Sequence, residues 1–216
     1  ILSGCGSQEE SLFLECPDLI ASIYFVEKMA AHEAVEIRQV RKLLEHNLML
    51  TSRRRVNLKD QFCRPGTLDS SGHHQHLTLV AMDAQSYNSY GLKPREQYKI
   101  EQIHRELTKC LAALELPSVS DVPASRVFVT GNWGAGCFRG DLELKLVIQW
   151  MACSMSGVSQ LIYCPWDQTA VLKEKGWHKL KNRLENGVKV ITVLDMLRSH
   201  EYAQARSTFE YILGKL

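Results

Sequence analysis

Four closely spaced glycines mark the stretch of this sequence where a phosphate group could bind. They lie between a β-branched segment, residues 127–130, and an apolar run that begins at Leu142. The glycines are Gly131, Gly134, Gly136 and Gly140. Glycine permits positive φ and a close approach to the backbone, and the N-terminus of the following helix offers N–H groups to a phosphate. The alternative is an ordinary βα turn, because the spacing matches neither the dinucleotide fingerprint nor the P-loop.

Two adjacent carboxylates, Glu9 and Glu10, are of a residue type that performs proton transfer. They enter a short apolar run that Pro17 stops. Two carboxylates crowded near a sugar can be driven to different pKa values, so that one stays protonated as a general acid while the other accepts hydrogen bonds. The alternative is that both are solvated residues in the first turn of a helix, where negative charge is favourable.

Alternating strands and helices must position these residues. The apolar patterns predict strands at 76–84, 127–130, 160–164 and 188–193. They predict helices at 94–114, from 142 onwards, within 168–186 and near 199–213, and one or two more between Pro17 and Leu50. This order predicts an α/β fold with a largely parallel sheet, helices on both faces, and ligands bound outside the carboxyl ends of the strands. The glycine loop and Pro165-Trp166 both follow such strand ends.

Composition restricts the class of protein. The chain has 216 residues, 45% of them hydrophobic, which suits a single domain over residues 1–216. Its net charge of +2 provides no global field toward nucleic acid or a membrane surface. Seven cysteines without Cys-x-x-Cys spacing argue against a disulfide framework and a zinc site, and favour an intracellular compartment. No apolar run reaches the length of a membrane helix, about 18 residues.

Residues 51–76 are predicted to form a surface loop. This segment combines an arginine triplet, Pro65-Gly66 and several histidines. The arginines could contact a polyanion, but a solvated charge run is the commoner outcome, and the histidines lack an accompanying set of metal ligands. We assign no role to Arg53, Arg54 and Arg55, or to His73, His74 and His76.

With these residues placed, the chain resembles the catalytic macrodomain of the poly(ADP-ribose) glycohydrolase family. Two motifs carry the resemblance: Gln8-Glu9-Glu10, and residues 131–141, which match Gly-Asn-Trp-Gly-x-Gly-x-Phe-x-Gly-Asp. They occur in the family's order and are separated by a strand and a helix resembling 77–114. The similarity extends from Ile1 to about Trp166 and is poor between about 27 and 76. It implies a three-layer α/β/α fold with a mixed, largely parallel sheet.

The resemblance also implies roles for individual residues. Glu10 would be the acid/base carboxylate, Glu9 would hold a ribose hydroxyl, and Gln8 would lie against the adenine. Trp166 falls where the family has an aromatic residue that stacks on adenine. The loop would contact the pyrophosphate mainly through its backbone, around Asn132, Gly134, Gly136, Cys137 and Phe138.

The implied activity is hydrolysis of the ribose–ribose O-glycosidic bonds of poly(ADP-ribose), with release of ADP-ribose and without a metal or other cofactor. The implied partners are poly(ADP-ribosyl)ated proteins in the nucleus or cytoplasm, with a part in the DNA damage response. Neither a membrane nor sequence-specific nucleic acid is implied. Two other hypotheses stay open: an ADP-ribose-binding module without catalysis, and a nucleotide-binding α/β domain of unrelated function.

The sequence departs from the family pattern at several positions. Arg139 stands where the family loop has glycine, and it either adds a cation or obstructs the approach of a phosphate. Gly6-Ser7 replace Cys-Val beside the carboxylates, and no tyrosine occurs between Tyr24 and Tyr87 to match a substrate-loop tyrosine. The family places a run of three glycines, and an asparagine further upstream, before the segment matching Ile1. We therefore expect part of the domain to precede this sequence.

Overall fold

The computed structural model describes residues 12–13, 15–46, 63–65, 68, 72, 76–88, 91–115, 126–165 and 168–216. Backbone contacts divide the chain into two compact units, one formed by residues 1–29 and 35–81 and the other by residues 30–34 and 82–216. Each unit has its own cluster of buried side chains. A single domain over residues 1–216 stays a prediction. Most of the predicted loop at 51–76 lies outside the described residues.

The first unit is built from two antiparallel strand pairs and short helices. Strand β1 (Val35–Arg41) pairs with β4 (His76–Ala81), and β2 (Leu44–His46) pairs with β3 (Cys63–Pro65). The helices are the 3₁₀ helix η1 (Pro17–Ala21) and α2 (Ser22–Phe25). Cys16, Leu19 and Val40 form the buried centre of this unit.

The helical prediction is wrong for the apolar positions from Val35 to Leu44, because a β-bulge disguises the alternation of a strand. Val35 and Ile37 are partly buried with exposed Glu36 between them, as expected of a strand. The register then shifts between Ile37 and Val40, and Gln39 in that interval has a φ of +58°. The extra residue returns Val40 to the buried face three positions after Ile37. A spacing of three resembles a helix.

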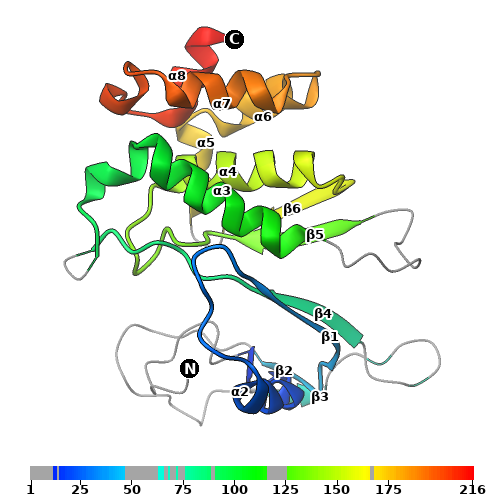
Figure 1. The fold of residues 1–216 in the computed structure, drawn as a ribbon. Coiled ribbons are helices and arrows are strands. Elements are labelled where there is room, and N and C mark those ends of the chain that lie inside the picture. Colours follow the sequence, from blue (N-terminus) through cyan, green and yellow to red (C-terminus); the bar gives the residue numbers. More distant parts are fainter. Residues whose placement is uncertain are drawn as a thin grey trace. The chain divides into compact units, whose positions relative to one another are not determined.

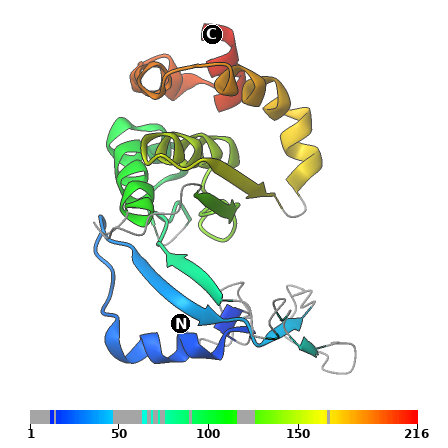
Figure 2. The same ribbon diagram turned by 90° about the vertical axis from the view of Figure 1, so that its right-hand side faces the viewer.

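The second unit stacks two layers of helices on a short parallel sheet (Figures 1 and 2). The sheet pairs β5 (Val127–Gly131) with β6 (Gln160–Cys164). Next to it lie α3 (Ile100–Leu114), which follows the 3₁₀ helix η3 (Pro94–Tyr98), and α4 (Leu142–Met155). The outer layer holds the remaining helices: α5 (Thr169–Glu174), α6 (Trp177–Glu185), α7 (Val190–Arg198), η5 (Tyr202–Gln204) and α8 (Thr208–Lys215).

Helix α4 is covered both by α3 and by the outer helices, as its apolar composition predicts. A helix that is apolar almost all round must be covered on every side. Leu146, Val147 and Met151 are all completely buried, and α4 contacts α3 on one side and α7 and α8 on the other. The helix predicted from residue 142 onwards is therefore confirmed, and it forms the buried centre of this unit.

Two boundaries in the outer layer differ from the prediction. The strand predicted at 188–193 is wrong, because this segment enters α7. Val193 and Leu197 are buried one turn apart, so the β-branched run follows a helical period that its short length conceals. The last helix begins at Thr208 rather than near 199. Ser207 caps this start, because its hydroxyl accepts a hydrogen bond from the Glu210 N–H at 3.2 Å.

Only part of the predicted sheet is present among the described residues. The parallel pair β5–β6 is confirmed, while the two strand pairs of the first unit are antiparallel. One face of β5–β6 carries Val127, Val129 and Ile162, which are exposed. A three-layer, largely parallel sheet with helices on both faces thus stays a prediction. No helix in the described part of the chain is both long and apolar enough to span a membrane.

Candidate phosphate-binding site

The glycine loop is fastened to the carboxyl ends of both parallel strands. It leaves β5 at Gly131, and the side chain of Asn132 then bridges to β6. The Asn132 amide nitrogen donates to the Pro165 carbonyl at 2.9 Å, and its amide oxygen accepts a hydrogen bond from the Tyr163 hydroxyl at 2.7 Å. The structure therefore brings the loop and Pro165 together, as predicted. Trp166, the next residue, lies outside the described residues.

Asp141 ends the loop by capping α4. Its carboxylate accepts hydrogen bonds from the Leu144 N–H at 2.7 Å and from the Tyr98 hydroxyl at 3.2 Å. Its own N–H donates to the side-chain oxygen of Gln97 at 2.5 Å. Burial raises the pKa of Asp141 above its usual value. This carboxylate is committed to the first turn of the helix, which fixes the point where the loop stops.

Three of the loop glycines are required by packing inside the protein. A Cβ atom at Gly134 would lie 2.9 Å from the Lys145 ammonium, and this residue also has a φ of +70°. A Cβ at Gly140 would lie 2.6 Å from the Gly134 carbonyl oxygen, and one at Gly131 would lie 2.9 Å from the carbonyl oxygen of Cys164. These distances are shorter than any normal contact, so the three positions exclude a side chain without any ligand being present.

Gly134→Ala is therefore expected to lower the free energy of unfolding by about 2–4 kcal/mol, the sum of left-handed strain and overpacking. Urea denaturation measures this loss. Gly157→Ala is the matched control, because Gly157 has a φ of +66° but nothing within 4 Å of its Cβ position. It should lose only the conformational part, about 1–2 kcal/mol. Equal losses in the two variants would contradict the packing role of Gly134.

Gly136 differs from the other three loop glycines. Nothing lies within 4 Å of a Cβ atom built there, and its φ is outside the left-handed region. Residues 136–138 are exposed, and within the described part of the chain their three N–H groups have no backbone acceptor. Consecutive unpaired N–H groups in a turn form a concave site for anions. We call residues 136–138 the amide cradle.

Two carbonyl groups of the cradle accept hydrogen bonds from residues 87 and 88. The Phe138 carbonyl accepts from the Tyr87 N–H at 2.8 Å, and the Cys137 carbonyl accepts from the Asn88 side-chain amide at 3.2 Å. The Arg139 N–H donates to the Gly136 carbonyl at 2.9 Å and closes the turn. Because these bonds restrain the peptide planes, the shape of the cradle is set before any ligand arrives.

A buried ion pair between α3 and α4 packs against the glycine loop. Lys145 of α4 and Glu106 of α3 are both buried and form a salt bridge. The Lys145 ammonium also lies 4.3 Å from the centroid of the Trp133 ring, within the range of a cation–π contact. Burial lowers the pKa of Lys145, and the charge of Glu106 opposes that shift. Sequence reasoning missed this pair; its signal was a charged residue inside an otherwise apolar helical run.

A second buried carboxylate, Glu143, joins the start of α4 to the outer helices. It accepts hydrogen bonds from the Lys175 ammonium at 2.6 Å, the Ser207 hydroxyl at 2.6 Å and the Phe209 N–H at 2.9 Å. Its side chain is 1% exposed. These three partners all come from the outer layer, so Glu143 has a structural role although it lies only two residues after Asp141.

A comparison with models of known protein families identifies the family of this chain. The model of the family described as poly(ADP-ribose) glycohydrolase (PARG), Macro domain fold, matches residues 1–173. The chain belongs to the poly(ADP-ribose) glycohydrolase family. Its α/β class agrees with a Macro domain fold, and the matched range includes both the glycine loop and the Gln8-Glu9-Glu10 motif.

Three curated relatives of this glycohydrolase family are similar over most of the chain. The "Probable poly(ADP-ribose) glycohydrolase 2" of Arabidopsis thaliana is 28% identical over 186 residues, covering 69% of this chain and 34% of the relative. Two proteins of Caenorhabditis elegans are each 27% identical: "Poly(ADP-ribose) glycohydrolase 1", covering 72% and 20%, and "Poly(ADP-ribose) glycohydrolase 2", covering 81% and 36%. The chain thus spans about a third or less of the length of these relatives.

The structure brings together part of the site predicted for a glycohydrolase of this family. Asn132, Gly134, Gly136, Cys137 and Phe138 lie in one loop at the ends of β5 and β6. Gln8, Glu9, Glu10 and Trp166 lie outside the described residues, so their predicted roles are untested.

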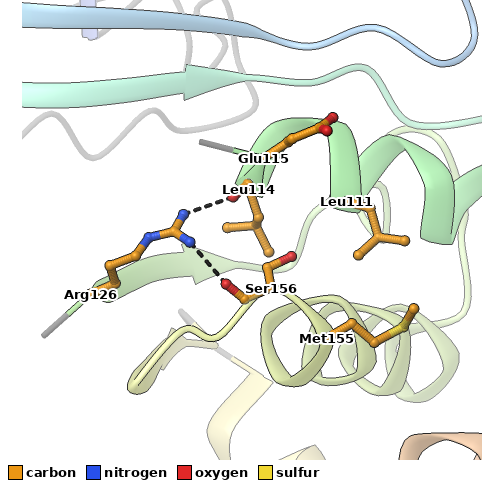
Figure 3. Close-up of a pocket in the computed structure, with 6 residues that line it drawn as sticks. All are labelled: Leu111, Leu114, Glu115, Arg126, Met155 and Ser156. Atoms are coloured by element: carbon orange, nitrogen blue, oxygen red, sulfur yellow. Dashed lines mark hydrogen bonds between the residues drawn. The ribbon is translucent and has the colours of Figure 1, made fainter. Parts of the chain in front are cut away.

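A hollow lies beside Arg126, which precedes β5, whereas the glycine loop follows the other end of this strand. Figure 3 shows the residues that line the hollow. Its volume is about 420 Å³, and it is lined by Leu111, Leu114, Glu115, Arg126, Met155 and Ser156. The Arg126 guanidinium donates to the carbonyls of Leu114 at 2.8 Å and Ser156 at 2.9 Å. These carbonyls end α3 and α4, where a cation is favourable. Arg126 therefore caps two helices.

Proposed function

We propose that this protein hydrolyses the ribose–ribose O-glycosidic bonds of poly(ADP-ribose) and releases ADP-ribose. The observation that carries the proposal is the amide cradle, where three N–H groups without a backbone acceptor in the described part of the chain lie beside open space at Gly136. A pyrophosphate suits such a site, because its oxygens accept several hydrogen bonds at once. Membership of the glycohydrolase family supports poly(ADP-ribose) as the source of that pyrophosphate.

Different parts of the loop would contribute in different ways. The side chain of Asn132 is bonded at both its nitrogen and its oxygen, which supports a positioning role for it. Gly134 packs against Lys145, so contacts to the pyrophosphate would come chiefly from the backbone of residues 136–138. Trp166 would stack on the adenine. Its position next to Pro165, which Asn132 holds at the loop, supports this assignment.

The proposed chemistry uses the carboxylates of the first motif. Glu10 starts protonated and gives its proton to the leaving ribose oxygen as an oxocarbenium-like state forms at the other ribose. It then takes a proton from the attacking water, which restores its initial state. Glu9 would accept hydrogen bonds from a ribose hydroxyl, and Gln8 would lie against the adenine. These steps conserve protons within one turnover.

The wider setting of this activity is also proposed. The substrate would be carried on poly(ADP-ribosyl)ated proteins of the nucleus or cytoplasm, in the DNA damage response. Residues 1–216 would form one three-layer α/β/α macrodomain. Family membership and the α/β class of the described residues support this organisation.

Gly136→Val is expected to weaken ADP-ribose binding about 100-fold or more, as calorimetry measures it. A branched side chain would occupy the space where the ligand meets the cradle, and losing two charge-assisted hydrogen bonds of about 1.5 kcal/mol each gives that factor. Thermal unfolding should change little, because the Cβ position is open.

Gly214→Val is the matched control for this experiment. Gly214 also has nothing within 4 Å of its Cβ position, but it lies in α8, in the outer helical layer. Its replacement should leave ADP-ribose binding intact. Unchanged affinity in a folded Gly136→Val protein would remove the assignment of the cradle to pyrophosphate.

A further inference from the structure

Arg139 has a backbone conformation that favours glycine. Its φ is +55°, in the left-handed region, where a Cβ atom crowds the following carbonyl oxygen. Its N–H closes the turn of the cradle by donating to the Gly136 carbonyl. The family pattern has glycine at this position, so the arginine brings backbone strain to a place where glycine would have none. Strained non-glycine residues of this kind cluster at ligand sites.

The Arg139 side chain is not committed to the fold. It is exposed, and no hydrogen bond or ion pair joins its guanidinium to any residue in the described ranges. Two other arginines of this unit differ from it: Arg105 pairs with Asp83 and Glu106, and Arg126 caps two helices. The five N–H donors of Arg139 are therefore available to an anion, in a planar arrangement that suits phosphate oxygens.

The local charges also favour an anion next to Arg139. The carboxylate that is nearest in sequence, Asp141, is occupied by the Leu144 N–H and the Tyr98 hydroxyl. The backbone of the cradle offers dipoles but no net charge, whereas a pyrophosphate diester carries two negative charges. A guanidinium three residues after Gly136 supplies the charge that the cradle lacks.

The geometry also answers whether Arg139 blocks the loop. Nothing lies within 4 Å of the Cβ position of Gly136, so the Arg139 side chain leaves the space beside this residue open. We propose that Arg139 is a phosphate-contacting residue that raises the affinity of this loop for the pyrophosphate of ADP-ribose. This inference rests on the proposed function and adds a specificity-determining residue to it.

The test compares wild type with Arg139→Gln by calorimetry at low and high salt. ADP-ribose affinity should fall about tenfold or more at low salt, because a charged hydrogen-bonding contact is lost. The difference should shrink at high salt, where the contact is screened. Adenosine, which has no phosphate, should bind both proteins equally. Arg139→Lys should recover part of the affinity, since it restores the charge without the planar fork.

Two control variants separate charge and backbone effects. Arg206→Gln removes an exposed arginine from the segment between η5 and α8 and should leave binding unchanged. Arg139→Gly should raise the melting temperature by relieving strain while still losing affinity. Gln39→Gly relieves the same kind of strain in β1 and should raise the melting temperature without changing affinity.

The outcomes distinguish this proposal from the proposed function. If wild type binds ADP-ribose and Arg139→Gln binds it equally well with the same salt dependence, the role of Arg139 is overturned and the function stands. Tighter binding by Arg139→Gly would show that the arginine obstructs the loop, which also overturns the proposal. If wild type binds no ADP-ribose, the proposed function fails and the role of Arg139 fails with it.

Discussion

Replacing Glu10 with glutamine is expected to slow the release of ADP-ribose from poly(ADP-ribose) by about two to four orders of magnitude, the usual contribution of a general acid/base. Glutamine keeps the shape of the side chain but cannot donate the proton that the leaving ribose oxygen needs. Binding of ADP-ribose should be nearly unchanged, because the proton is required only in the transition state. Single-turnover release from the polymer and calorimetry with ADP-ribose measure the two effects on the full-length protein.

Glu9→Gln is the neighbouring control, and it should behave differently. If Glu9 accepts hydrogen bonds from a ribose hydroxyl, its replacement should reduce both release and ADP-ribose affinity. Equal hydrolysis by wild type and Glu10→Gln would show that Glu10 is not the general acid/base. A wild-type protein that binds ADP-ribose and releases none would instead be a binding module.

Lys145→Met is expected to lower the free energy of unfolding by about 3–5 kcal/mol, the largest stability loss among these variants. Methionine nearly preserves the stem that packs against Gly134 and Gly140, but it removes the buried ammonium from the Glu106 carboxylate and leaves Arg105 as the remaining cation beside it. Chemical denaturation measures the loss. The double variant Lys145→Met with Glu106→Gln should recover part of it, because the buried charge that has lost its lysine partner is then removed as well.

A surface lysine provides the matched control for Lys145. Lys181 pairs with Glu185 one helical turn away at 3.5 Å, and both side chains are at least half exposed. Lys181→Met should change stability by less than about 1 kcal/mol, as is usual for an exposed ion pair. A loss for Lys145→Met that is no larger than this would contradict the supporting role of the buried pair.

The local part of the site could be predicted from sequence because its signals are local. A β-branched segment, clustered glycines and an apolar run predict a strand, a loop and a buried helix, and β5, the loop and α4 confirm them. The meeting of the loop with Pro165 was also predictable, since parallel strands that start from the same edge end at the same edge.

The remaining features depend on neighbours that are distant in sequence. The apolar positions around Gln39 and those after Val190 have spacings that fit either a strand or a helix. A bulge makes the first segment a strand, and the second segment forms the start of α7. The sequence does not distinguish the four loop glycines from one another. Only their spatial neighbours show that packing requires three of them and leaves the Cβ position of Gly136 open. The Lys145–Glu106 pair exists because α3 and α4 lie side by side. A lysine within the apolar run of α4 indicates a buried charge, but it does not indicate which residue of α3 is its partner.

The hydrogen bonds of Glu143 show how far toward the C-terminus the second unit must extend. The family match stops at residue 173, yet the partners of this buried carboxylate, Lys175, Ser207 and Phe209, all come later. A fragment cut at the family boundary would keep the loop and lose those partners, leaving a charge without compensation in the first turn of α4. The compact unit that presents the cradle therefore extends through α8, and the last 43 residues, 174–216, belong to it.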